Sequence, residues 1–123
     1  MKREAEPVKH VLFGAEDVAP GKMRAVEVDG IPIVVVRKAD GQFHALRNSC
    51  PHRGAAVSGG FLLQKVVCPS SNEYKLDEST LVVRCPWHNY EYDVETGNCM
   101  VEGDRGLKVY SVAVENGQVV LSR

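Results

Sequence analysis

Two short stretches decide how this sequence is interpreted: Cys50-Pro51-His52-Arg53-Gly54-Ala55 and Cys85-Pro86-Trp87-His88. Each stretch places one cysteine and one histidine within a few residues of each other, so a tight loop can direct a thiolate and an imidazole at one point. Two thiolates and two imidazoles suit either zinc or an iron–sulfur centre. We therefore predict a metal centre bound by Cys50, His52, Cys85 and His88.

The order of these ligands separates the two kinds of centre. Common zinc fingers pair Cys with Cys in one loop and His with His in the other. Here both loops are mixed, and Cys precedes His in each. A binuclear cluster with two sulfur ligands on one iron and two imidazoles on the other needs one ligand of each kind from each loop, if the loops face each other. The order favours an iron–sulfur cluster, and a zinc-binding interaction module is the less favoured alternative.

The paired C-x-H and C-x-x-H stretches resemble the cluster loops of Rieske proteins. The resemblance is carried by Cys50–Ala55 and by Cys85–Gly97, which reads CPWHNYEYDVETG, and it extends over the flanking strands from about Val8 to Leu121. Within the family, the sequence looks most like small stand-alone bacterial Rieske-type ferredoxins. The resemblance implies one 2Fe–2S cluster and an all-β Rieske fold of the kind found in respiratory iron–sulfur proteins.

The resemblance also implies a role for each ligand. Cys50 and Cys85 would bind the inner iron, and His52 and His88 would bind the outer iron near the surface. Rieske centres have potentials of about −150 to +300 mV, against about −400 mV for plant-type ferredoxins, because two neutral imidazoles replace two thiolates.

High-potential respiratory members of the family carry two further cysteines that join the loops by a disulfide. The corresponding positions here are Ala55 and Trp87, and Asn89-Tyr90 replaces the serine that follows the second histidine ligand. Fewer hydrogen bonds to the cluster sulfurs stabilise the reduced cluster less. These residues predict a low-potential centre.

Outside the two loops, the sequence predicts short β-strands joined by tight turns. Alternating or β-branched runs indicate strands, and Asp-Gly or Asn-Gly between such runs indicates hairpins. No segment has a sustained apolar period of 3.6 residues, so the expected class is all-β. The predicted strands are Val8–Phe13, Met23–Val28, Ile31–Val36, Gln42–Asn48, Leu107–Val114 and Gln118–Leu121, and the predicted turns contain Asp29-Gly30, Asp40-Gly41 and Asn116-Gly117.

The middle of the chain differs from the flanking segments. We predict a single Rieske domain, residues 1–123, in which about 8–48 and 97–122 form an antiparallel β sandwich or barrel scaffold. Residues from about 49 to 96 form a small, loop-built cluster-binding subdomain, with strand signals only at Leu81–Arg84 and Tyr90–Val94. The spacer between the loops is long, and its additional segment, Leu63–Asp77, is expected to be a surface hairpin or, alternatively, an element that docks a partner.

Composition excludes several classes of function. The 123 residues carry a net charge of −1, and no basic run could follow a phosphate backbone, so we expect no nucleic-acid partner. The charged N-terminus lacks the apolar segment of a secretory signal, and the longest apolar runs, such as Ile33–Val36, are too short to cross a bilayer. We expect a cytoplasmic protein without a membrane partner, in which Cys68 and Cys99 are free thiols rather than a disulfide.

These observations predict a one-electron carrier between a reductase and a terminal oxygenase or other oxidoreductase. The chain is not expected to be an enzyme by itself, because His10 and His44 lie on separate predicted strands without the spaced carboxylate of a mononuclear iron site. The alternative is a small Rieske subunit of a larger oxidoreductase complex of the nitrite-reductase type.

Overall fold

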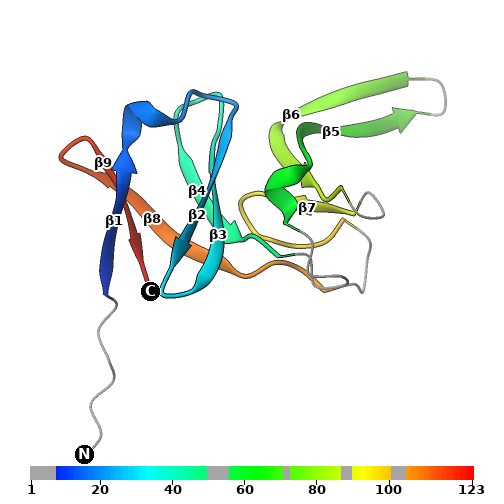
Figure 1. Ribbon diagram of the computed structural model, residues 1–123. Coiled ribbons are helices and arrows are strands. Elements are labelled where there is room, and N and C mark those ends of the chain that lie inside the picture. The colour runs from blue at the N-terminus through cyan, green and yellow to red at the C-terminus, as the bar shows by residue number, and fades with distance from the viewer. Residues whose placement is uncertain (1–7, 50–55, 71–72, 87–89, 101–104) are drawn as a thin grey trace, which may run out of the picture.

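The computed structural model describes residues 8–49, 56–70, 73–86, 90–100 and 105–123, and for residues 64–80 it describes the backbone alone. The described part of the chain contains nine strands and two 3₁₀ turns (Figure 1), and none of its helices is long and apolar enough to cross a membrane. The elements are β1 (Lys9–Gly14), η1 (Ala15–Asp17), β2 (Met23–Val28), β3 (Ile31–Arg37), β4 (Phe43–Arg47), η2 (Val57–Gly59), β5 (Phe61–Ser70), β6 (Glu73–Arg84), β7 (Glu91–Asp93), β8 (Val109–Glu115) and β9 (Gln118–Ser122).

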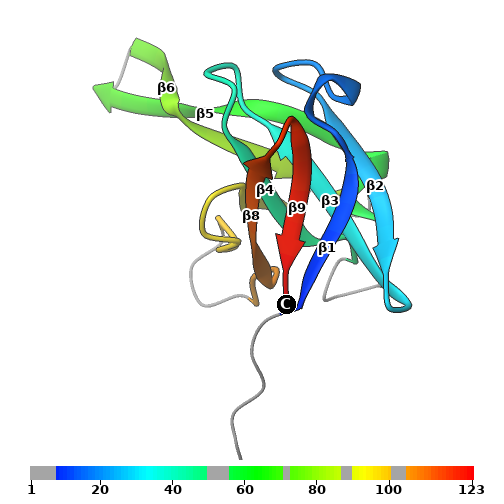
Figure 2. The ribbon, with the colours of Figure 1, turned by 90° about the vertical axis from the view of Figure 1, so that its left-hand side faces the viewer.

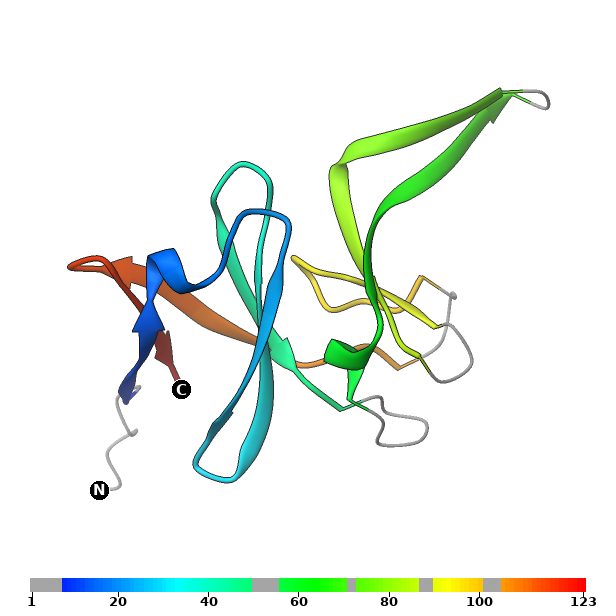
Figure 3. The ribbon, with the colours of Figure 1, turned by 45° about the horizontal axis from the view of Figure 1, so that its top comes forward.

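The strands form two antiparallel sheets. The larger sheet has the order β1-β9-β8-β4-β3-β2, and the smaller has the order β5-β6-β7. The larger sheet curls into a nearly closed barrel on one side of the molecule, and the smaller sheet lies beside β3 and β4 (Figures 1 and 3). The prediction of an all-β scaffold with a separate smaller unit is therefore confirmed at the level of fold class.

Strand β3 is buried on both faces. Successive residues of a strand point to opposite sides of the sheet, so Ile33 and Val35 join the core inside the larger sheet, while Val34 and Val36 join a second core. All four side chains are fully buried. This double burial explains why the sequence of β3 is a continuous apolar run rather than an alternating one.

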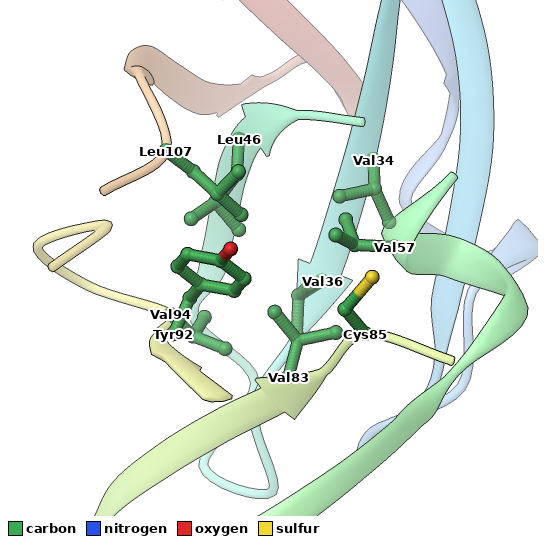
Figure 4. Close-up of a cluster of buried hydrophobic side chains, with 9 residues drawn as sticks. All are labelled: Val34, Val36, Leu46, Val57, Val83, Cys85, Tyr92, Val94 and Leu107. Carbon is green, nitrogen blue, oxygen red and sulfur yellow. The ribbon is translucent and has the colours of Figure 1, made fainter. Parts of the chain in front are cut away.

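The second core lies between the two sheets. Val34, Val36 and Leu46 contribute from the larger sheet, and they meet side chains from η2, β6, β7 and the segment before β8 (Figure 4). Those partners are Val57, Val83, Cys85, Tyr92, Val94 and Leu107. The predicted metal loops are therefore attached to a unit whose apolar contacts fix it against the scaffold.

The three predicted hairpins are present, but their turns differ. Both central residues have positive φ in Asp29-Gly30 (52° and 79°) and in Asn116-Gly117 (53° and 75°), as two-residue hairpins of this kind require. In the third turn only Gly41 has positive φ, because the Asp40 carboxylate instead accepts a 2.9 Å hydrogen bond from the N–H of Gln42. An aspartate that caps its own turn in this way does not need the left-handed conformation.

The expectation of a loop-built middle segment was wrong in one respect. The ten residues of β5 and the twelve of β6 pair as the two strands of a long hairpin that extends away from the body (Figures 1 and 2). Its register shifts between Gln64 and Lys65 and again between Val67 and Ser70. Two irregularities in one hairpin interrupt the residue alternation that identifies a strand in sequence. The surface hairpin predicted for Leu63–Asp77 is thus the outer part of a longer element.

Candidate metal centre

Of the four predicted ligands, Cys85 is described by the structure, whereas Cys50, His52 and His88 lie outside the described residues. Ala55 and Trp87, which occupy the positions of the two disulfide cysteines in high-potential members of the family, also lie outside the described residues. The site is therefore built here from Cys85 and from the residues that begin and end each loop.

Cys85 follows the last residue of β6 and is fully buried. Its sulfur points toward Val57 of η2, which comes directly after the first predicted metal loop (Figure 4). Val34, Val36 and Val83 belong to the same apolar cluster. A buried sulfur in an apolar surrounding is the environment expected of a ligand to an inner iron that is shielded from water.

The two ends of the first loop are joined by the side chain of Asn48. Its Oδ1 accepts a hydrogen bond from the Ser58 N–H, and its Nδ2 donates one to the Ser58 Oγ, each at 2.8 Å. Asn48 is the buried polar side chain of the described core, and both of its hydrogen-bonding groups are used. The segment that contains Cys50 and His52 therefore begins and ends at the same place.

The second loop is closed in a different way. The Cys85 N–H donates a 2.7 Å hydrogen bond to the carbonyl oxygen of Tyr90, so the two ends of this segment lie side by side. One residue further out on each strand, Arg84 forms an ion pair with Glu91. These contacts join the described residues on either side of the segment that contains His88 in the sequence.

The closed ends of the two loops are in contact with each other. A Cβ placed on Gly60 would overlap the carbonyl oxygen of Arg84, so the two backbones approach more closely than any other residue type permits. Phe61, the next residue, is paired with Arg84 across β5 and β6. Both loops thus start from one small region beside Cys85, as a cluster that takes one Cys and one His from each loop requires.

Acidic residues after the second loop are largely engaged within the molecule. Glu91 binds Arg84, Glu95 binds Lys38, and the Asp93 Oδ1 accepts hydrogen bonds from the N–H groups of Glu95 and Thr96. Glu102 and Asp104 lie outside the described residues. The three described carboxylates therefore stabilise local structure.

The two remaining histidines lie on β1 and β4, as the sequence predicts. His44 lines a small recess between the sheets with Glu95 and Tyr110, and burial lowers its pKa below the ordinary value. The Nε2 of His44 and the hydroxyl of Tyr110 have no hydrogen-bond partner in the described part of the structure.

The other two cysteines lie outside the two predicted metal loops. Cys99 is a half-buried free thiol that forms an isolated β-bridge with Tyr92. Cys68 lies on β5, where the structure describes the backbone alone. The sequence did not identify Asn48, Ser58, Arg84 or Glu91 as parts of the site, because contacts that close a loop depend on register and leave no motif.

An antiparallel barrel that presents two mixed Cys–His loops from one region defines a class of small iron–sulfur proteins. The chain belongs to the Rieske [2Fe-2S] domain family, whose model matches residues 8–111. The cofactor of this family is a Rieske-type 2Fe–2S cluster. The residues described around Cys85 fit such a cluster, because they provide a buried thiol, an apolar shell and two adjacent loop ends.

Two curated relatives give the range of proteins that contain similar sequences. The chain is 32% identical over 115 residues to apoptosis-inducing factor 3 of Mus musculus, covering 93% of this chain but spanning only 16% of that protein's length. It is 28% identical over 107 residues to the 3-phenylpropionate/cinnamic acid dioxygenase ferredoxin subunit of Escherichia coli, covering 85% of this chain and 84% of that subunit.

Solved structures agree with the fold. A structure assigned as the NADH-dependent nitrite reductase small subunit of Mycobacterium tuberculosis superposes with a TM-score of 0.79 at 22% identity, covering 95% of this chain and 96% of that one. The complex of reduced oxygenase and oxidised ferredoxin in carbazole 1,9a-dioxygenase contains a chain with a TM-score of 0.71 at 29% identity. That match covers 93% of this chain and 92% of the other.

Proposed function

We propose that this protein is a one-electron carrier whose Rieske 2Fe–2S cluster is bound by Cys50, His52, Cys85 and His88. The observation that carries the proposal is the position of Cys85, buried between the closed ends of both loops. The two thiolates would hold the inner iron and the two imidazoles the outer iron. When bound, the cluster accepts and releases a single electron.

The chain's own residues have three tasks in this function. The apolar cluster around Cys85 excludes water from the sulfur side of the site. Asn48 and Ser58 fix the ends of the first loop, and the Cys85–Tyr90 hydrogen bond fixes those of the second. A site held rigidly in this way changes little between the oxidised and reduced states, which suits rapid electron transfer.

The carrier would work at low potential and between protein partners. Low potential is supported by Ala55 and Trp87, which stand where a loop-joining disulfide would place cysteines. A terminal oxygenase as electron acceptor is supported by the dioxygenase ferredoxins to which the chain is similar, and we propose a reductase as the electron donor. We propose that the domain has no catalytic reaction of its own and supplies electrons to an enzyme that does.

Purification followed by metal analysis tests this proposal. We expect a red-brown protein with about two iron atoms and two acid-labile sulfides per chain, and an electron paramagnetic resonance signal after reduction. Replacing Cys85 with Ser should remove the cluster, whereas replacing Cys99 with Ser should leave it intact. A colourless wild-type protein that contains one zinc ion per chain would instead support the zinc-binding module.

A further inference from the structure

The ion pair between Arg84 and Glu91 has an unusual geometry. The Nε and Nη2 of Arg84 both donate to the same carboxylate oxygen, Oε2 of Glu91, at 3.0 and 2.6 Å. The two residues face each other directly in the register of β6 and β7. Both side chains are partly buried, with 40% and 31% of their surface exposed, so their charges are screened less than those of fully exposed pairs.

The position of the pair relates it to the proposed cluster. Arg84 immediately precedes Cys85, and Glu91 immediately follows Tyr90, whose carbonyl oxygen accepts the hydrogen bond from the Cys85 N–H. The ion pair is therefore the next pair along the same two strands, β6 and β7, beside the Cys85–Tyr90 hydrogen bond. A substitution at Arg84 or Glu91 therefore alters the charge directly beside the Cys85–Tyr90 hydrogen bond.

Charge next to an iron–sulfur cluster affects the two redox states unequally. Reduction adds one negative charge, so a nearby cation stabilises the reduced state and a nearby anion stabilises the oxidised state. In the wild-type protein the Arg84 Nη2 and the Glu91 Oε2 lie 2.6 Å apart, so the fields of these opposite charges would largely cancel at a cluster bound through Cys85.

We propose that Arg84 and Glu91 are positioning residues that close the second cluster loop and, as a balanced pair, set the reduction potential. This inference rests on the proposed function, because it requires the cluster to be bound at Cys85. It predicts that removing either charge shifts the potential, and that the two removals shift it in opposite directions.

Charge-neutral variants test this balance. Glu91→Gln leaves the Arg84 cation unopposed and should raise the potential, whereas Arg84→Gln leaves the carboxylate and should lower it. Each shift should change the ratio of reduced to oxidised cluster at a fixed solution potential by about threefold to tenfold. The double variant, which has neither charge, should return close to the wild-type ratio.

Matched controls separate the electrostatic role from a structural one. Lys9 and Glu115 form an ion pair on the larger sheet, away from β6 and β7, so Lys9→Gln and Glu115→Gln should leave the potential unchanged. Arg84→Lys keeps the positive charge but cannot donate from two nitrogens to the Glu91 carboxylate. It should therefore keep the wild-type potential but lose iron faster when it is incubated with a chelator. The shifts in Glu91→Gln and Arg84→Gln should shrink in high salt.

Film voltammetry and redox titration followed by electron paramagnetic resonance measure these shifts. Opposite shifts in the two single variants, with restoration in the double variant, would support the proposal. Shifts in the same direction, or none in variants that contain full iron, would overturn it. If Arg84→Gln does not fold, Glu91→Gln compared with Arg84→Lys still gives the sign of the charge effect. A wild-type protein without iron would refute the proposed function itself.

Discussion

Asn48 and Ser58, ten residues apart in the chain, are joined by two hydrogen bonds of 2.8 Å that lie at the border between scaffold and cluster loop. The Asn48 side chain both donates and accepts, so neither of its polar atoms is left unsatisfied in a buried position. The contact converts the segment between them into a closed loop whose two ends cannot separate without breaking both bonds.

Replacing Asn48 with Ala should destabilise the fold and the cluster together. The change leaves the Ser58 N–H without its acceptor in a partly buried position, at a cost of about 1–3 kcal/mol. We expect a lower midpoint in urea and faster loss of iron to a chelator. Asn98 is exposed, and Asn98→Ala should change neither quantity. Equal loss of iron in both variants would contradict this role for Asn48.

Gly60→Ala should be much more damaging than Gly59→Ala. At Gly60 the added methyl group overlaps the Arg84 carbonyl oxygen, whereas at Gly59 it meets only the side chain of Pro86 at an ordinary 3.7 Å. Overpacking against backbone costs about 1–3 kcal/mol or more. Chemical denaturation and iron content measure the difference. If the two neighbours behaved alike, the two loop ends could not be in such close contact.

Replacing Leu46 or Leu121 with Ala should show that the two cores have different roles. Both side chains are fully buried, and each Leu→Ala change should cost about 2–5 kcal/mol. Leu46 packs between the sheets with Tyr92 and Cys85, whereas Leu121 packs inside the larger sheet. Only Leu46→Ala should therefore also increase hydrogen exchange in β7 and accelerate iron release at a temperature where both variants remain folded.

Stability should decrease in mild acid because of His44. Burial is the main cause that lowers its pKa, and Lys38 lowers it further, while Glu95, Asp40 and Asp93 oppose the shift. The unfolded chain therefore takes up a proton more readily than the folded chain, and stability is lost as pH falls below the ordinary value of 6.5. His44→Gln should flatten this part of the pH profile in thermal unfolding. An unchanged slope would show that other groups cause it.

A second acid-sensitive contact joins the sheets through Lys38 and Glu95. Their ion pair lowers the pKa of Glu95 and raises that of Lys38. Its contribution is present above the ordinary pKa of Glu95, 4.5, and is lost as pH falls below it. Glu95→Gln should remove this loss, which appears at lower pH than that caused by His44. If stability depended on pH in the same way in His44→Gln and in Glu95→Gln, the two losses of stability could not be assigned to different groups.

His88→Cys should retain a cluster and lower its potential. An anionic thiolate in place of a neutral imidazole disfavours the added electron, in the direction of all-cysteine ferredoxins. Voltammetry measures the change in potential. His10→Cys serves as the control, because it adds a thiol on β1 and not at a predicted ligand position. A potential that stays at the wild-type value would argue against His88 as a ligand.

Much of the scaffold could be predicted because its signals are local. The strand Met23–Val28 and the hairpins at Asp29-Gly30 and Asn116-Gly117 follow from residue types that act within a few positions of one another. The long hairpin β5–β6 was predicted only in part, since its register shifts interrupt the alternation on which recognition depends.

The sequence by itself determined the family and the identity of the candidate ligands, because thiolates and imidazoles at these spacings are a chemical property of two short loops. The folded chain, and not the local sequence, buries Cys85 in the core between the two sheets, closes one loop through Asn48, and places Arg84 and Glu91 at the ends of the other. Those contacts depend on strand register and on the packing of two sheets. They join residues whose proximity is fixed only when the whole chain has folded.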